Sequence, residues 1–207
     1  MDAIMHLEQD WPEYQRATRD KMLARLEKFP KGVLVLERDG EIVATQTSFP
    51  MRYSRDDLTR MKSWGDVTNH GYLPDIDMKT ANALYIVSGV IRKDVRGTKA
   101  FNVMIQGPLE VAQSFGLDCV LTGAVMPGYD AYCSRHGEMK AGDYAFLKLN
   151  GCLADPFLEL YRGHGFMVPD RNHIIENYYP DLPSRNYGAI VVRELRGRES
   201  ERIDAKG

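Results

Sequence analysis

Residues 160–166, Leu-Tyr-Arg-Gly-His-Gly-Phe, predict a helix that ends at a glycine and passes directly into a strand. Glycine readily adopts the left-handed conformation that often closes a helix. The helix is predicted to begin at Asp155 or Pro156, because Asp-Pro is a typical pair of cap and first-turn residues. Its last turn therefore carries Tyr161 at an exposed end, and a strand is predicted to start over residues 166–168.

A second informative segment lies upstream, where residues 83–91 read Ala-Leu-Tyr-Ile-Val-Ser-Gly-Val-Ile. Both faces of this predicted strand are apolar, which is typical of a central strand. A basic turn over residues 92–97 follows, and then a helix over 98–115. A turn that leads into a helix N-terminus can bind an anion, because free N–H groups and a partial positive charge meet there. Gly107-Pro108 is predicted to kink or split this helix.

The remaining pattern alternates between helices and strands, which is typical of an α/β protein. Asp39-Gly40 predicts a tight hairpin. Residues 53–80 are polar and irregular, and loops of that length are usually functional or disordered. The other predicted elements are a helix over 12–29, strands over 33–37, 42–49, 118–125 and 186–194, a loop-rich insertion over 126–152, and a charged tail over 195–207.

Length and composition predict one domain over residues 1–207. A net charge of −2, with scattered Lys and Arg, argues against a nucleic-acid partner. No apolar run approaches the roughly 20 residues of a membrane span, and the N-terminus lacks the order of a signal peptide. Three cysteines fit a reducing, cytoplasmic setting. No Cys or His pair has the spacing of zinc ligands, so no metal is expected.

Taken together, the two segments and the element order resemble the GCN5-related N-acetyltransferase (GNAT) superfamily over residues 31–194. Residues 64–187 look like the GNAT domains fused to nitrilase-like hydrolases. The pieces in common are the long loop before Ala83, the turn over 126–129, the insertion after it and the late Tyr187-Gly188. The resemblance implies a mixed, mostly antiparallel central sheet, splayed between two central strands and flanked by helices. The usual first strand either lies over residues 3–7 or is absent.

The resemblance places the donor's phosphates at a turn formed by Arg96, Gly97, Thr98 and Lys99. The family pattern has glycines where this chain has Lys99 and Phe101. Glycine permits a close backbone approach, and Phe101 would crowd a diphosphate. Three alternatives follow: an altered pose of acetyl-coenzyme A or another acyl-CoA, a donor phosphopantetheine on an acyl carrier protein, or a degenerate binding site. Arg-Gly alone is also a common turn into a helix.

The resemblance also implies the reacting groups. Backbone N–H groups of the central strand, at Val87, Ser88, Gly89 and Val90, would bind the thioester carbonyl, and the pantetheine arm would lie between this strand and residues 118–125. Tyr161 would protonate the leaving thiolate, because a tyrosine with a pKa near 10 is protonated at neutral pH. The alternative for Tyr161 is a packing role on the helix, with its hydroxyl at the surface.

The general base and the acceptor pocket are less constrained. His70 precedes the central strand on the side where acceptors lie in this fold, and histidine has a suitable pKa. His136, Glu138 and His164 are weaker candidates, and any of these histidines can equally be a surface residue. Trp64 and Tyr129 are candidates to line the acceptor pocket, although aromatic packing under a loop explains them equally well. Thr122, with a nearby histidine, is the candidate position for decarboxylation of a malonyl thioester.

The sequence therefore predicts a GNAT-type N-acyltransferase that moves an acetyl or other acyl group from a thioester to a small-molecule amine. One alternative is an acyltransferase or decarboxylase that uses an acyl carrier protein in lipid or polyketide biosynthesis. Another is a non-catalytic GNAT-like binding domain. Pairing through the last strands would give a homodimer.

Overall fold

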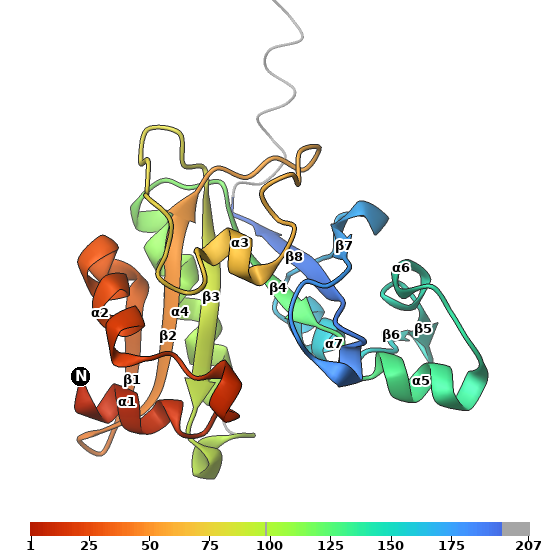
Figure 1. Cartoon of the computed structure of the whole chain (residues 1–207), viewed down its shortest axis with the longest axis horizontal. Helices are drawn as coiled ribbons and strands as arrows, with labels where there is room; N and C mark the ends of the chain where they lie inside the picture. The colour runs from red at the N-terminus through yellow and green to blue at the C-terminus, as the bar shows by residue number, and fades with distance from the viewer. Residues whose placement is uncertain (98, 196–207) are drawn as a thin grey trace, which may run out of the picture.

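A single six-stranded sheet organises the computed structural model, which describes residues 1–97 and 99–195. The strand order is β1-β2-β3-β4-β8-β7, and all neighbours are antiparallel except the parallel pair β3 and β4 (Figure 1). The predicted mixed, mostly antiparallel sheet is therefore confirmed. The strands are β1 Val33–Arg38, β2 Glu41–Met51, β3 Ala83–Ile91, β4 Cys119–Val125, β7 Ile174–Ile175 and β8 Gly188–Glu194.

The hairpin between β1 and β2 forms as predicted. Asp39 and Gly40 have φ angles of 54° and 79°. Two consecutive positive φ angles define the tight turn whose twist matches that of the flanking strands. Arg38 and Glu41 close the ladder on either side of this turn.

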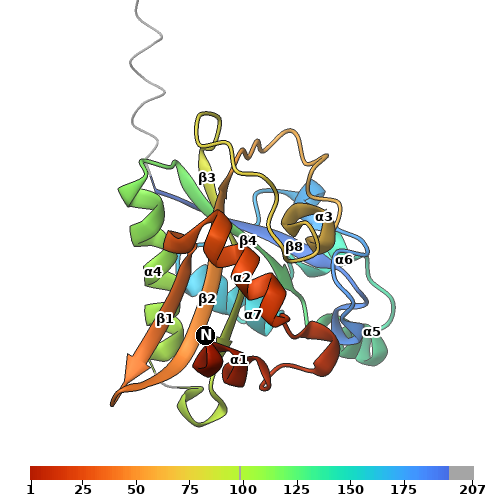
Figure 2. The same ribbon diagram turned by 60° about the vertical axis from the view of Figure 1, so that its left-hand side comes forward.

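Helices cover both faces of the sheet. α1 (Asp2–Glu8) and α2 (Arg19–Lys28) lie on one face, and α4 (Ala100–Ser114) and α7 (Pro156–Gly163) lie on the other (Figures 1 and 2). α4 continues through Pro108 as one helix, so the predicted split does not occur. A Cβ on Gly107 would lie 2.7 Å from Leu34 Cδ1, so this glycine lets α4 approach β1 closely.

The N-terminal segment differs from expectation. Residues 2–8 form α1, so the short strand considered there does not exist. The helix expected over 12–29 is shorter, because a 3-10 turn at Glu13–Gln15 precedes an extended segment. α2 starts only after Thr18, whose side chain accepts a hydrogen bond from the Lys21 N–H at 3.3 Å. A side-chain cap of this kind is a strong helix start.

The two irregular regions are both ordered into short elements. The long loop before β3 contains α3 (Trp64–Thr68). The insertion contains α5 (Tyr129–His136), α6 (Ala141–Tyr144) and the two-stranded pair β5 (Lys148–Leu149) and β6 (Cys152–Leu153). The remaining short turns are η2 Pro30–Gly32, η3 Lys93–Val95, η4 Arg171–His173 and η5 Leu182–Ser184.

The segment that carries Tyr161 is held as the sequence predicts. The buried carboxylate of Asp155 accepts hydrogen bonds from the N–H groups of Phe157 and Leu158, at 3.0 and 3.1 Å, and so caps α7. Beyond the helix, the expected strand over 166–168 is reduced to one bridge between Met167 and Val192. In the described part of the chain, no helix combines the length and apolarity that crossing a bilayer demands.

Candidate active site

The central feature of the site is the point where β3 and β4 separate. Their parallel ladder runs from Ala83–Cys119 to Ile86–Thr122 and stops there. β3 continues to Ile91 alongside β2, and β4 continues to Val125 alongside β8. The two strands therefore diverge like the arms of a V beyond their shared ladder, as Figure 1 shows. The Thr122 hydroxyl donates to the Ile86 carbonyl at 3.0 Å and closes the apex of the V.

A β-bulge marks the β3 arm immediately beyond the apex. Thr47 of β2 pairs with Ser88, and the next β2 residue, Ser48, pairs with Ile86. Val87 is thus the extra residue on β3, and bulges of this kind redirect backbone groups, often next to active sites. Val87 and Val90 are buried, Ser88 is half-buried and Gly89 is exposed. These are the four β3 residues that the sequence predicts for donor binding.

The carbonyl of the bulge residue is held by Trp64. The indole Nε1 of Trp64 donates to the Val87 oxygen at 2.9 Å, and the Trp64 ring meets Tyr179 edge-on, with centroids 5.6 Å apart. The structure thus brings Trp64 to the V, as a support of the bulge. His70 lies in the same loop, exposed, with a positive φ of 52°.

Tyr161 lies on α7, on the face of the sheet opposite α1 and α2. Its ring lies between Phe101 and Phe166, with centroid distances of 6.1 and 5.6 Å. Burial raises the pKa of Tyr161 to about 12, so the phenol keeps its proton at neutral pH. The hydroxyl has no hydrogen-bond partner among residues 1–97 and 99–195, and it is therefore free to donate to a bound molecule.

Phe101, which replaces a family glycine, is part of the same aromatic group. Its ring packs against Tyr161 and, at 5.3 Å between centroids, against His164. The Phe101 ring therefore faces α7. His164, a weaker candidate for the general base, packs against this ring.

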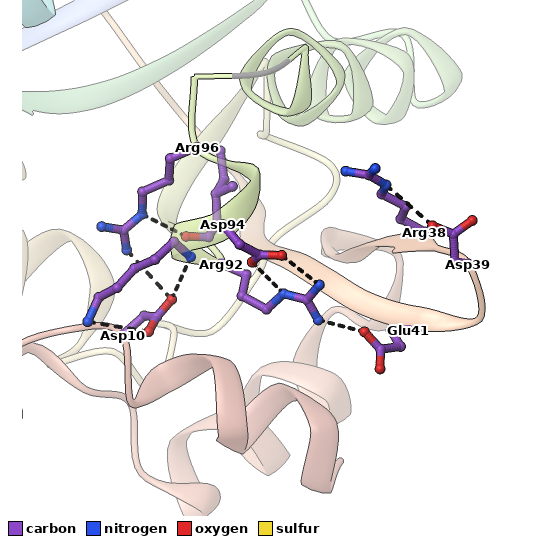
Figure 3. A network of polar contacts seen from close by, with 9 residues as sticks. Asp10, Arg38, Asp39, Glu41, Arg92, Asp94 and Arg96 are labelled. Atoms are coloured by element: carbon purple, nitrogen blue, oxygen red, sulfur yellow. Dashed lines mark hydrogen bonds and ion pairs between the residues drawn. The ribbon is translucent and has the colours of Figure 1, made fainter.

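The expected phosphate turn carries several basic groups, some of which are already engaged. Arg96 Nε donates to the Ile91 carbonyl at 2.9 Å, and its Nη2 lies 3.8 Å from the carboxylate of Asp10 (Figure 3). Asp10 also accepts from the Lys93 backbone N–H at 3.0 Å. Gly97 has a φ of 79°, and no atom lies near the position of a Cβ. Lys99 is exposed directly before α4, and Thr98 lies outside the described residues.

A second ion-pair group lies beside this turn. Arg92 bridges Asp94 and Glu41, at 2.7 and 2.8 Å (Figure 3). These two carboxylates raise the pKa of Arg92 above its ordinary value, because they stabilise its charged form. Arg92 is thus held by two close carboxylates, whereas the ion pair of Arg96 with Asp10 is longer, at 3.8 Å.

The insertion residues have structural partners. Tyr129 is buried, its hydroxyl donates to the Met139 carbonyl at 2.6 Å, and its ring packs on Tyr144 and Tyr187. The two weaker base candidates are also engaged: His136 packs on the Tyr132 ring, and Glu138 pairs with Arg185. These contacts favour a packing role for Tyr129.

Sequence reasoning missed a buried tyrosine pair near the V. The hydroxyls of Tyr85 and Tyr178 are hydrogen-bonded, and both rings are buried. The Tyr178 ring occupies the space where a Cβ on Gly123 or Gly188 would lie, at 2.1 and 2.3 Å. A glycine inside a buried strand signals this kind of close approach, and Gly123 was the available signal.

Two surface hollows lie away from the V, at the end of β2. Their volumes are about 320 and 250 Å³, and they share Met51, Arg52 and Arg60. They lie where β2 ends, near the start of β3, because Met51 pairs with Ala83. They are thus separate from the V, which opens at the other end of β3.

Two curated proteins are distantly similar to the chain in sequence. The chain matches no family model. The probable hydrolase YhcX of Bacillus subtilis is 25% identical over 182 residues, which are 87% of this chain and 34% of YhcX. The uncharacterized N-acetyltransferase YkwB of the same organism is 23% identical over 181 residues, 87% of this chain and 76% of YkwB. The chain therefore spans only about a third of YhcX.

Solved structures agree with the sheet described above. The GphF GNAT-like decarboxylase, in complex with isobutyryl-CoA, has a TM-score of 0.77 and 25% identity, with 94% of each chain covered. The loading GNATL domain of CurA from Lyngbya majuscula has a TM-score of 0.77 and 20% identity, over 93% of this chain and 92% of that one. The divided central sheet, the bulge beside the point of divergence and these likenesses agree, and the chain has the fold of the GCN5-related N-acetyltransferase superfamily.

Proposed function

We propose that the chain is a GNAT-type N-acyltransferase that moves an acetyl or other acyl group from acyl-CoA to a small-molecule amine. Two observations support this proposal: the bulge in β3 where β3 and β4 diverge, and the raised pKa of the Tyr161 phenol on α7. Acyl transfer needs a hydrogen-bond donor to the thioester carbonyl oxygen and an acid that protonates the leaving thiolate. In this proposal, β3 supplies the hydrogen-bond donors and α7 supplies the acid.

The reaction is direct attack of the amine on the thioester. The pantetheine arm lies in the V between β3 and β4, and backbone N–H groups over Val87, Ser88, Gly89 and Val90 bind the thioester carbonyl. Fixed N–H groups stabilise the oxyanion of the tetrahedral intermediate without reorganisation. Tyr161 then protonates the departing thiolate. Its raised pKa means that the phenol carries its proton at neutral pH.

The phosphate turn holds the donor's diphosphate through Arg96, Gly97 and Lys99. Arg96 moves from Asp10 to the phosphate, because one long ion pair with a partly exposed carboxylate is weak. Exposed Lys99 adds a charge where the family has a glycine. Phe101 packs toward Tyr161, so its ring supports the proposed acid.

His70 is the proposed base for the acceptor amine. It belongs to the loop that Trp64 fastens to the bulge, so the base and the thioester carbonyl are held by one local structure. The acceptor then enters from the α3 side of the sheet, opposite Tyr161.

Three cysteines without disulfides fit a reducing cytosol.

A second function is favoured by one comparison. The GphF GNAT-like decarboxylase and the CurA loading domain both have TM-scores of 0.77, whereas an aminoglycoside 6'-N-acetyltransferase complexed with coenzyme A has 0.58. The alternative is therefore an acyltransferase or decarboxylase that uses a thioester on an acyl carrier protein. Thr122, at the apex of the V, is the proposed substrate contact in that case.

One experiment separates these functions. Calorimetric titration with acetyl-CoA is made on the wild type and on Arg96→Ala, and each protein is then incubated with acetyl- and malonyl-CoA, with and without a panel of amines. Acetylated amine and free coenzyme A support the first function. Conversion of malonyl- to acetyl-CoA without an amine supports the second. Binding without any turnover indicates a non-catalytic domain, and absence of binding calls for the same assay with acylated carrier protein.

A further inference from the structure

A buried arginine lies directly behind the bulge. Arg25 of α2 is 2% exposed, and its Nε donates to the Gly71 carbonyl at 2.8 Å. Its Nη1 lies 3.3 Å from the hydroxyl of Ser88 on β3. Burial lowers the pKa of Arg25 to about 10, and the nearby carboxylate of Glu8 opposes this shift, so the guanidinium stays charged at neutral pH. Buried charges are costly, and one retained beside a proposed site invites a functional explanation.

Ser88 connects this charge to the V. It is the residue after the bulge and is half-buried, whereas Arg25 is closed off from solvent. The guanidinium has only donors, so the Ser88 oxygen must accept from Arg25. The hydroxyl proton of Ser88 then has no acceptor among the described residues, and it is available to a molecule in the V.

The loop that holds Arg25 is under backbone strain. Asn69, His70 and Leu73 have φ angles of 49°, 52° and 64°. Leu73 is fully buried, and a bulky residue at positive φ is a clear outlier. Such strain persists where the surrounding structure enforces it, often at functional sites. Here it places the Gly71 carbonyl against Arg25, which fixes the guanidinium toward Ser88.

We infer that the Ser88 hydroxyl donates a hydrogen bond to the thioester carbonyl oxygen as negative charge develops there, with Arg25 as its positioning residue. The inference rests on the proposed function. Donation by a charged guanidinium polarises the hydroxyl and strengthens it as a donor, because hydrogen bonds in a chain reinforce one another. Ser88 therefore contributes a side-chain donor beside the backbone N–H groups of the bulge.

The first test is Ser88→Ala, with Ser114→Ala as the matched control. Ser114 is exposed at the end of α4, where its hydroxyl donates to the Val111 carbonyl. We expect Ser88→Ala to lower kcat about 100-fold, as the loss of one oxyanion donor does, with an unchanged Kd for acetyl-CoA. Tm should fall somewhat, because Arg25 Nη1 loses an acceptor, and the kinetics are therefore measured well below Tm. Ser88→Thr, which keeps the hydroxyl, should restore much of kcat, and Ser114→Ala should match the wild type. A Ser88→Ala enzyme with wild-type kcat overturns the inference.

The second test asks whether Arg25 acts through Ser88. Arg25→Lys is measured in the wild-type and Ser88→Ala backgrounds, and Tm is recorded for each protein. We expect Arg25→Lys to lower kcat in the wild type and to add little in Ser88→Ala, because effects on one contact are not additive. Additive losses overturn the role of Arg25, and if Arg25→Lys fails to fold, the Ser88 variants decide alone. A wild type with no thioester turnover overturns the proposed function and this inference together.

Discussion

The ring of Phe101 meets the ring of Tyr161 edge-on, with centroids 6.1 Å apart. Phe101 is in the first turn of α4, at a position where the GNAT family pattern has glycine. Tyr161 is in the last turn of α7. The contact therefore joins the turn that would bind phosphate to the residue that would protonate the thiolate. It links two parts of the proposed site that are 60 residues apart in the chain.

Replacing Tyr161 by phenylalanine should lower kcat about 100-fold, because a positioned general acid typically contributes at least that much. The ring and its contacts remain, so the Kd for acetyl-CoA should not change. Release of free thiol measures kcat, and calorimetry measures Kd. Tyr14→Phe, which removes a hydroxyl from an exposed tyrosine, is the control. If kcat is the same in Tyr161→Phe as in the wild type, Tyr161 is not the acid.

Replacing Phe101 by alanine should lower kcat more than it changes KM. Aromatic pairs contribute about 1 kcal/mol beyond their buried area, and here the ring orients Tyr161. Phe101→Leu, which keeps most of the apolar volume, should lie between alanine and the wild type. Steady-state kinetics and thermal unfolding of the same samples check this. A loss in KM alone would assign Phe101 to donor binding instead.

Replacing Asp10 by asparagine should tighten donor binding. Asp10 holds Arg96 at 3.8 Å and Lys93 at 3.7 Å, and a donor phosphate must compete with it. Loss of a surface ion pair is worth up to about 1 kcal/mol, so Kd should fall by at most about fivefold. Glu41→Gln, which removes one of the two carboxylates paired with Arg92 and leaves the pair of Arg96 intact, is the matched control. Weaker binding by Asp10→Asn in calorimetric titration would show that the carboxylate supports the turn rather than blocking it.

Replacing Asp170 by asparagine should lower Tm at pH 7, and the effect should shrink progressively as the pH is lowered below about 4. The hydrogen bond from His173 Nδ1, at 2.9 Å, holds the pKa of Asp170 below its ordinary value. A lowered carboxyl pKa gives stability that is present above the unfolded value and is lost as the pH falls through the folded value. The side chain of His173 is fully buried and also bonds to Tyr53, so the pair anchors η4.

Circular dichroism melts at pH 7 and over a series of lower pH values check this prediction. Asp143→Asn, which breaks an exposed pair with Arg171, is the control and should change Tm little at any pH in the series. An Asp170→Asn effect of equal size at every pH would mean that the carboxylate charge plays no part.

Local signals predicted the local structure. The cap at Asp155, the turn at Asp39-Gly40 and the identity of the two central strands could all be read from residue type and spacing. Residues 2–8 showed the limit, because a short apolar pattern fits a helix or a strand equally well. The separation of β3 from β4 depends on which partner each strand keeps, and periodicity carries no such information.

The contact between Arg25 and Ser88 was beyond sequence reasoning for a similar reason. The two residues are 63 positions apart, and neither belongs to a motif. Their contact depends on how α2 and the strained loop pack against β3. The position of Tyr161 in the last turn of α7 was predictable because a local segment determines it. Groups that come together from three elements become visible only in the folded chain.

The early end of the β3–β4 ladder has a mechanical consequence. Four residue pairs, Ala83–Cys119 to Ile86–Thr122, join one three-stranded unit, β1-β2-β3, to another, β4-β8-β7. β3 stays paired with β2 as far as Ile91, and β4 stays paired with β8 as far as Val125. The four-pair β3–β4 ladder, the seam between the units, can therefore act as a hinge that changes the width of the V without breaking either unit. A donor seated between the two arms would brace them, and amide hydrogen exchange along the seam would slow on binding.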